Sequence, residues 1–304
     1  GASCPTRMSK RNLAILAAIC ASLIYGVNHT VAKGVMPHYV EPFGFIFLRV
    51  VGASFLFWIC SFFGPKERIE KKHWPRIILC ALLGMVINML SFFKGLQLST
   101  PINSAVLVTI SPIIVVALSA VFLRERIKLL KGLGIFLGFV GALALILFGA
   151  EVRGDAPNIP LGNILFVINA TAYGTYLIVV KTLIERYHPF TLMKWLFTIA
   201  VFINLPITLP EFLEIEWSTM PLWAYFSVIF VVVGTTFMTY LFNVFALTQL
   251  KASTVGAFIY LQPLFGILFA VFSGKDQITA IKLIATGLVL LGVYLASKKP
   301  KPQP

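Results

Sequence analysis

The sequence predicts an all-α polytopic membrane protein with ten transmembrane helices in two five-helix repeats of inverted topology. Three observations lead to this fold: the composition, the length of the apolar runs and an internal repeat. Of the 304 residues, 59% are hydrophobic and 12% are charged, and the mean hydropathy is +0.92. A soluble domain carries about twice that share of charge. Lipid is therefore the expected solvent for most of the chain.

Apolar runs of about 20 residues recur along the whole length, and each could cross a bilayer as a helix. A transmembrane β-barrel is excluded, because its strands would be about ten residues long and would alternate apolar with polar. Prolines near four starts fit first-turn positions, where a missing N–H costs nothing: Pro42, Pro75, Pro101 and Pro221. We expect spans over 12–33, 43–63, 75–97, 101–123, 129–149, 160–181, 190–209, 220–247, 252–273 and 278–297.

The second half of the chain is a diverged copy of the first. Pro263 follows Pro112 by 263 − 112 = 151 positions, and both interrupt apolar runs. The same offset pairs further residues of like type: Leu90 with Leu241, Leu96 with Leu247, Glu125 with Asp276, Lys131 with Lys282 and Gly141 with Gly292. Each copy holds five spans, an odd number, so the second copy enters the membrane from the opposite face. Inverted repeats of this kind are a recurring design of secondary transporters.

The repeat also sets the expected domains. Residues 12–149 and 160–297 form the two five-helix repeats, and 1–11 and 298–304 are cytoplasmic tails. Met8 reads as a natural start, so 1–7 is interpreted as sequence left over from an expression vector. A signal peptide is the alternative for the first run. That run has a copy in mid-chain, with Tyr25 on Tyr173 (173 − 25 = 148), which a cleaved segment would not need.

The charges in the loops predict the orientation. Lysine and arginine gather in alternate loops, so the net charge of +14 indicates membrane orientation and not nucleic-acid binding. The predicted cytoplasmic loops carry Lys10, Arg11, Lys66, Arg68, Lys71, Lys72, Arg76, Arg124, Arg126, Lys128, Lys131, Lys181, Arg186, Lys194, Lys251 and Lys298 among others. The opposite side carries Lys33, Arg153, Lys275 and Lys282. Both termini are therefore expected on the cytoplasmic side of a bacterial inner membrane.

Acidic residues are absent from the interiors of the expected spans. All 11 of them lie in loops or at span ends. Buried carboxylates are the usual proton relays and cation sites of pumps, so antiport of cationic drugs through a buried glutamate is disfavoured. No metal motif or paired carboxylate occurs, and the cysteines suit neither zinc nor a disulfide framework, so we expect no enzyme activity, no metal and no cofactor.

Two strongly charged residues lie inside spans, Arg49 and Lys94. A cation at membrane depth is costly unless it faces a cavity, a carbonyl cluster or an anion. One interpretation is capture of a substrate carboxylate or phosphate. The other is structural, through snorkelling to the interface or a bond to carbonyls at a helix end.

Polar residues in the apolar runs mark a candidate substrate site. Span eight carries Thr235, Thr239 and Asn243 on one helical face, and span three presents Asn88 and Ser91 on the corresponding face. Hydrogen bonding between helices is the structural alternative. The symmetric placement favours a shared central cavity.

Further candidates lie on spans one, four, six and nine: Tyr25, Asn28, His29, Ser111, Asn169, Tyr173, Tyr260 and Gln262. His29 is the one side chain deep in a span that titrates near neutral pH, so it is the candidate for proton coupling. Pro112 and Pro263 each remove a helix hydrogen bond at a symmetric place, which suits a hinge or gate; static curvature is the alternative.

Small residues predict close helix packing. Ala14, Ala18, Ser22 and Gly26 form a stripe on span one. Gly134-x-x-x-Gly138 on span five could join two copies of the chain or two helices of one copy, so both a monomer and a homodimer remain open.

The order of several short motifs resembles the EamA family of the drug/metabolite transporter superfamily. The first half carries Tyr25-Gly26-Val27-Asn28, Lys33, Arg49, Gly95-Leu96-Gln97, Pro112 and Glu125, and the second repeats Tyr173-Gly174, Lys181, Ala246-Leu247, Pro263 and Asp276. The resemblance implies ten helices in inverted halves and a central cavity lined by spans one, three, four, six, eight and nine. It also implies export of amino acids and other small metabolites.

We therefore expect an inner-membrane transporter that works by alternating access, with a small-molecule substrate, membrane lipid as its surroundings and no nucleic-acid partner. Amino acids or related carboxylates are the expected substrates. The alternatives are efflux of hydrophobic drugs and lipid flipping. A receptor is disfavoured by the inverted repeat, a channel by the lack of a selectivity-filter segment, and an enzyme by the lack of a reactive constellation.

Overall fold

The structure, a computed structural model, describes residues 8–99, 104, 108–148, 157–272 and 278–298. Throughout these residues the regular secondary structure is helical. Eight of the described helices are long and apolar enough to cross a membrane, and two shorter apolar helices cover Ser111–Phe122 and Leu129–Ala144. The prediction of an all-helical polytopic membrane protein is thereby confirmed. The count of ten spans and the inversion of the halves stay predictions.

The helices follow the expected spans closely. The first half holds α1 (Lys10–Val35), α2 (Pro42–Phe62), α3 (Trp74–Ala81), α4 (Asn88–Leu98), α6 (Ile110–Phe122) and α7 (Leu129–Leu147). The second half holds α8 (Ile159–Ile184), α9 (Pro189–Leu213), α10 (Leu222–Ile229), α11 (Thr239–Leu247), α12 (Ala252–Ala257), α13 (Leu261–Phe272) and α14 (Ala280–Ser297). Pro101 and the expected span ends at 149 and 273 lie outside the described residues.

Local capping explains where several helices begin. The side chains of Ser9, Asn158 and Thr279 each accept a hydrogen bond from a backbone N–H in the first turn of α1, α8 and α14. Each bond satisfies one of the donors that a helix start leaves without a partner. Pro42 stands in the first turn of α2, as predicted.

Two spans contain a π-helical stretch that the sequence pattern did not reveal. Leu82–Ile87 joins α3 to α4, and Phe230–Met238 joins α10 to α11. Both stretches end at the same position of the repeat, since Met238 lies 238 − 87 = 151 residues after Ile87. π-Helical segments are rare and often occur at functional sites.

The two central prolines lie just after irregular turns in their spans. Pro112 is in the first turn of α6, which follows a turn at Thr109. Pro263 is in the first turn of α13, which follows the 3₁₀ segment Phe258–Tyr260. Each irregular turn lies directly before its proline, where the missing N–H leaves the carbonyl four residues upstream without its helix bond, as the sequence predicted. The role of the two prolines as a hinge or gate stays a prediction.

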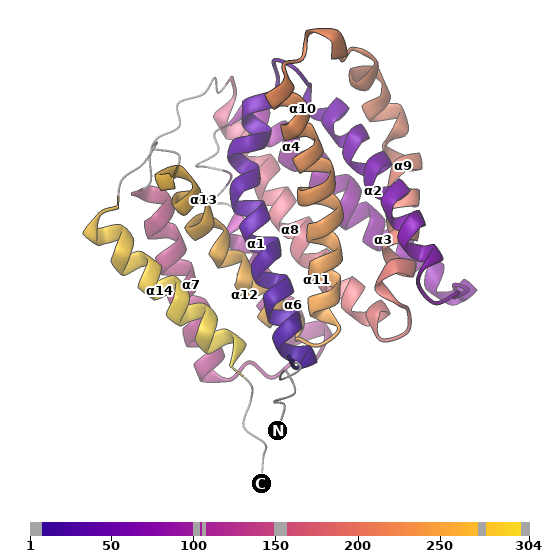
Figure 1. Cartoon of the computed structure of the whole chain (residues 1–304). Helices are drawn as coiled ribbons and strands as arrows, with labels where there is room; N and C mark the ends of the chain where they lie inside the picture. The colour runs from indigo at the N-terminus through magenta and orange to yellow at the C-terminus, as the bar shows by residue number, and fades with distance from the viewer. Residues whose placement is uncertain (1–7, 100–103, 105–107, 149–156, 273–277, 299–304) are drawn as a thin grey trace, which may run out of the picture.

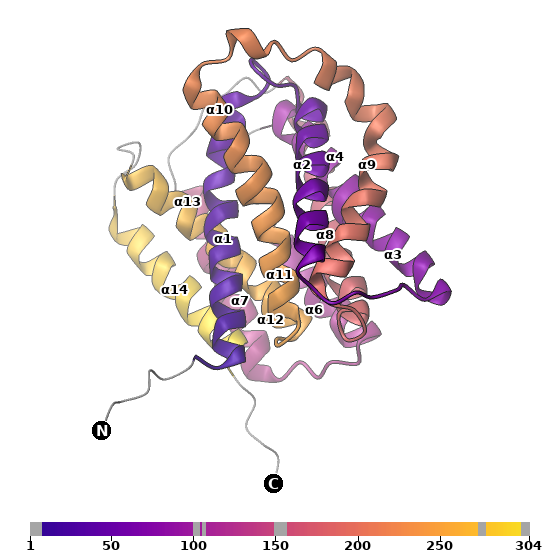
Figure 2. The same ribbon diagram turned by 45° about the vertical axis from the view of Figure 1, so that its right-hand side comes forward.

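The helices pack as a bundle with two distinct edges. In Figures 1 and 2, α7 and α14 lie side by side at one edge and α2, α3 and α9 lie at the other, with α1 and α11 between them. Within the bundle, α1 packs against α11 and α13, and α8 packs against α4 and α6. Large apolar side chains such as Phe202, Leu222 and Ile284 are exposed on the outside, as a surface that faces lipid requires.

Glycines let α7 and α14 approach backbone to backbone. A Cβ on Gly134 would lie 2.7 Å from the Gly292 carbonyl oxygen, and a Cβ on Gly292 would lie 2.6 Å from the Gly134 carbonyl oxygen. A Cβ on Gly138 would meet the Tyr260 ring at 2.6 Å. The Gly134-x-x-x-Gly138 motif is therefore used for packing inside one chain.

Two lysines that the repeat pairs with each other hold equivalent helix ends. Lys33 Nζ donates to the Leu96 carbonyl at 2.8 Å, and Lys181 Nζ donates to the carbonyls of Leu247 and Leu250 at 2.5 and 2.9 Å. Leu96 and Leu247 are repeat partners (247 − 96 = 151). Lysine near a helix C-terminus satisfies carbonyls that have no partner in the helix and suits the helix dipole.

Candidate functional site

A cavity lined by both polar and apolar side chains lies between helices of both halves. Its wall is formed by Tyr25, Asn28, His29, Arg49, Asn88, Met89, Phe92, Val108, Ser111, Asn169, Tyr173, Thr235, Tyr240, Ile259 and Gln262.

The cavity is displaced from the end of the bundle where the first and last helices meet. At that end Arg11 Nη2 donates to the Ser297 carbonyl at 2.5 Å, which joins the start of α1 to the end of α14. The cavity residues of α1, Tyr25, Asn28 and His29, lie past the middle of this 26-residue helix. On α1 the cavity wall is therefore formed by the half of the helix that is farther from Arg11 and Ser297.

Helix α1 is brought to the cavity by its small residues. Ser22 Oγ donates to the Phe258 carbonyl at 2.7 Å, and a Cβ on Gly26 would lie 2.6 Å from the Gln262 carbonyl oxygen. This close contact sets the register in which Asn28 Oδ1 accepts a hydrogen bond from Thr235 Oγ1 at 3.0 Å. His29 Nδ1 is 2.8 Å from Ser104 Oγ.

An amide and phenol cluster joins both halves at one wall of the cavity. Asn88 Nδ2 donates to the Gly84 carbonyl at 2.9 Å and to Tyr240 Oη at 3.0 Å, and Tyr240 Oη donates to the same carbonyl at 2.6 Å. Asn169 Nδ2 donates to the Asn88 carbonyl at 3.1 Å and also contacts Asn88 Oδ1. Gly84 belongs to the π-helical stretch, so the irregular backbone supplies an acceptor to side chains from two other elements.

We expect Tyr240→Phe to destabilise the protein by about 1–2 kcal/mol, because Asn88 Nδ2 loses one acceptor while the ring packing is kept. Tyr240 is 1% exposed, so water does not replace the hydroxyl. Unfolding followed by the melting temperature of the purified protein measures the change. Tyr294→Phe, at a side chain that is 60% exposed, is the control and should have almost no effect. Equal melting temperatures for the two variants would contradict the hydrogen bonds assigned to the Tyr240 hydroxyl.

Arg49 is the one cation on the described cavity wall besides the titratable His29, and it is 4% exposed. Its Nε donates to Thr236 Oγ1 at 2.6 Å, and its guanidinium carbon lies 4.8 Å from the centre of the Phe93 ring. Thr236 Oγ1 in turn donates to the Val231 carbonyl across the second π-helical stretch at 2.9 Å. These contacts fix the guanidinium and use its Nε–H. Among the described residues neither Nη group has a hydrogen-bond partner, so both could donate to a ligand.

No acidic side chain lines the described cavity wall. Arg49 is therefore a buried cation beside amides, hydroxyls and phenols, without a carboxylate among them. A guanidinium in this setting favours a planar anion such as a carboxylate, which it can bind through two parallel hydrogen bonds.

Nine of the predicted site residues line the cavity: Tyr25, Asn28, His29, Arg49, Asn88, Ser111, Asn169, Tyr173 and Gln262. Of these, Ser111 Oγ also donates to the Ala170 carbonyl at 3.1 Å, which ties α6 to α8.

Five predicted residues do not line it: Ser91, Lys94, Thr239, Asn243 and Tyr260. Ser91 and Thr239 each donate to a carbonyl one turn back in their own helix. Asn243 Nδ2 donates to Tyr173 Oη at 2.7 Å and so supports a cavity residue from behind. Lys94 Nζ donates to Gln97 Oε1 at 3.0 Å near the end of α4, which agrees with the structural alternative. Tyr260 packs against Gly138 of α7.

Five lining residues were not predicted from the sequence: Met89, Phe92, Val108, Tyr240 and Ile259. Thr235, on the polar face of span eight, also lines the cavity. Four of the five missed residues are repeat partners of one another. Val108 pairs with Ile259 and Met89 pairs with Tyr240 at the offset of 151, as Ser111 pairs with Gln262. Some lining residues thus occur as repeat partners, but an apolar pair such as Val108 and Ile259 has no residue type that marks it in an apolar run.

Comparisons with known proteins point to one family of transporters. The model of the EamA-like transporter family matches residues 12–147 and again 160–298. An uncharacterized transporter of Archaeoglobus fulgidus is 26% identical over 261 residues, which cover 86% of this chain and 90% of that protein. The uncharacterized transporter YoaV of Bacillus subtilis is 25% identical and is covered to 95% by 92% of this chain. A protein of known crystal structure shares the fold with a TM-score of 0.74 over 93% of this chain and 96% of that one, at 17% identity.

Proposed function

Because this chain belongs to the EamA-like transporter family, we propose that it carries amino acids or related small carboxylates across the bacterial inner membrane by alternating access. The protein is a multi-pass membrane transporter by family, and its relatives are named as transporters and not as enzymes. The substrate class, the direction of transport and the identity of the membrane belong to the proposal.

The buried Arg49 is the observation that supports a carboxylate as the substrate. It lies on the cavity wall at 4% exposure with no acidic side chain on the described wall. A cation at this depth is costly without an anion, so a substrate carboxylate would supply the missing charge. The surrounding amides and phenols, from Asn28, Asn169 and Tyr173, would bind the rest of a small polar molecule.

The helix packing supports a mechanism in which residues 12–149 and 160–297 act as two inverted halves. Helix α1 packs on α11 and α13, and its repeat counterpart α8 packs on the counterparts α4 and α6. Repeat partners such as Ser111 and Gln262 both line the cavity. A site at the interface of two such halves becomes accessible from either side when the halves rock.

We further propose that the protein is an exporter or exchanger that does not require a proton gradient. The described cavity wall carries one histidine, His29, and no carboxylate. His29 Nδ1 is already 2.8 Å from Ser104 Oγ. Flux in proteoliposomes should continue after the pH gradient is collapsed with an ionophore, and flux that stops would contradict this part.

Counterflow in proteoliposomes tests the substrate class. Vesicles loaded with one compound from a panel of amino acids, organic anions and cationic dyes are assayed for uptake of the same labelled compound. We expect uptake of one or more carboxylates and none of the dyes. The melting temperature of the purified protein should rise with the same compounds, because binding to the native state stabilises it.

Efflux of hydrophobic drugs is the second candidate, favoured by the apolar part of the wall. Met89, Phe92, Val108 and Ile259 face the cavity. Transport of cationic dyes, with no uptake of any carboxylate, would favour this candidate over the first. Arg49 would then be expected to matter little.

A further inference from the structure

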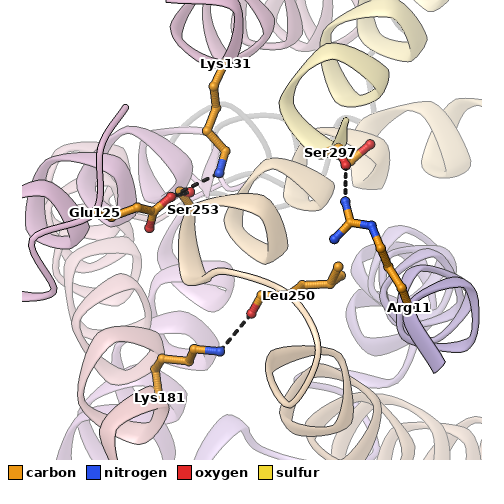
Figure 3. A network of polar contacts seen from close by, with 7 residues as sticks. All are labelled: Arg11, Glu125, Lys131, Lys181, Leu250, Ser253 and Ser297. Atoms are coloured by element: carbon orange, nitrogen blue, oxygen red, sulfur yellow. Dashed lines mark hydrogen bonds and ion pairs between the residues drawn. The ribbon is translucent and has the colours of Figure 1, made fainter. Parts of the chain in front are cut away.

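A buried ion pair and a serine join the two halves at the end of the bundle where α1 begins and α14 ends. Lys131 Nζ of α7 lies 3.0 Å from Glu125 Oε1, and the two side chains are only 14% and 6% exposed. Ser253 Oγ, on α12 of the second half, donates to the same carboxylate oxygen. Figure 3 shows these three residues together, with Arg11, Ser297 and Lys181 around them.

The end of α6 directs Glu125 into this position. Arg124 adopts a left-handed conformation with φ of 52°, and the next N–H, of Glu125, returns to the Ser119 carbonyl at 3.1 Å. A left-handed residue after the last turn is a common helix stop, although arginine is rarely the residue that supplies it. The chain turns sharply there, and the Glu125 carboxylate points at Lys131 and Ser253.

The space between this cluster and the cavity is closed by direct contact of the halves. Ser111 of α6 lines the cavity, and one turn further Val115 is completely buried. A Cβ on Gly256 of α12 would lie 3.2 Å from Val115 Cβ. The contact between α6 and α12 therefore begins at Val115, one turn past the cavity residue Ser111, and extends to the cluster of Glu125 and Ser253.

We propose that Glu125, held by Lys131, is the latch of this closed end: its bond to Ser253 keeps α12 against α6 and breaks when the cavity opens toward the termini. The proposal rests on alternating access as the mechanism. Lys131 holds the carboxylate in place within the first half through its ion pair of 3.0 Å. The hydroxyl of Ser253 is neutral, so it can leave without separating two opposite charges.

The local backbone allows α12 to move. It is a six-residue helix, and the 3₁₀ segment Phe258–Tyr260 separates it from α13. A short helix next to such a break can rotate with little loss of regular hydrogen bonds. Lys181 anchors the preceding loop by the Leu250 carbonyl, so the movement would pivot beside that bond.

Cysteine labelling tests the latch without a known substrate. A Val115→Cys reporter is placed in a chain whose native cysteines are replaced by alanine, and a membrane-impermeant thiol reagent is applied from the side of the termini. In Ser253→Ala and in Glu125→Gln the reporter should react about tenfold faster than with the latch intact, as expected when one hydrogen bond to a charged group is lost or weakened in a two-state equilibrium. Glu70→Gln, at an exposed pair with Lys72 at the same end, is the matched control and should change nothing.

Unchanged labelling in Ser253→Ala, with the melting temperature kept, would overturn the latch. Ser253→Ala decides the question if Glu125→Gln does not fold, because it removes a single hydroxyl. The outcome is separate from that of the transport assay: labelling can respond to the latch when no compound of the panel is carried. Conversely, carboxylate flux together with indifferent labelling would keep the proposed function and remove the latch.

Discussion

Arg49→Met is expected to abolish carboxylate transport while leaving the protein as stable as before, or more stable. The guanidinium is 4% exposed and has no acidic partner on the described cavity wall, so its burial opposes folding. Methionine fills a similar volume without the charge. Thr236 Oγ1 keeps its bond to the Val231 carbonyl, so the substitution orphans no donor. Uptake should fall by about 100-fold or more, the loss expected for a two-nitrogen contact to a carboxylate.

Arg49→Lys is the matched control for this experiment. It keeps the charge and loses the planar fork, so transport should be intermediate if a carboxylate is bound through two hydrogen bonds. The pair of variants is assayed for counterflow and for melting temperature. Undiminished carboxylate uptake by Arg49→Met would place the anion site elsewhere, and a large loss of stability would assign Arg49 a structural role.

Gly292→Val should disrupt the packing of α14 against α7 and destabilise the protein strongly. A Cβ at this position would lie 2.6 Å from the Gly134 carbonyl oxygen and 2.8 Å from Gly138 Cα, and backbone atoms cannot rotate away as side chains do. We expect a destabilisation of about 3 kcal/mol or more, at the upper end for overpacking of a well-packed contact. Loss of monodisperse protein after extraction, or a much lower melting temperature, measures it.

Gly287→Val on the same helix is the control. A Cβ on Gly287 would meet nothing within 4 Å, so the change should remain within about 0.5 kcal/mol. Both substitutions alter the helix propensity equally, so their difference isolates the contact. If the two variants were equally stable, the close approach of α7 and α14 would be wrong.

The fold was predictable to the extent that it depends on composition and spacing. Runs of apolar residues indicated helices of the right length and place, and side chains such as Ser9 and Asn158 mark helix starts by local chemistry. The family could be recognised because its motifs recur in order in both halves. The π-helical stretches were not visible, because Leu82–Ile87 has the same apolar character as its neighbours.

The candidate site was predictable only for residues whose type is unusual in lipid. Asn28, Asn88 and Arg49 are costly there, so their presence indicated a cavity or a partner. Ser91 and Thr239 were included for the same reason, but their hydroxyls bond back to their own helix, which a sequence cannot distinguish from pointing inward. Phe92 is apolar among apolar residues, so its place on the wall had no local signal.

By itself the sequence determined that this chain is a membrane protein of the transporter family, that the apolar runs described by the structure are helical, and that the family pattern occurs twice. Hydropathy and run length act locally, and the repeat is found by comparing the chain with itself. Only the tertiary structure decided that Arg49 is held by Thr236 and that Glu125 meets Ser253. Those contacts join residues more than 100 positions apart, and they depend on the rotation and depth of each helix, which side-chain packing between helices sets.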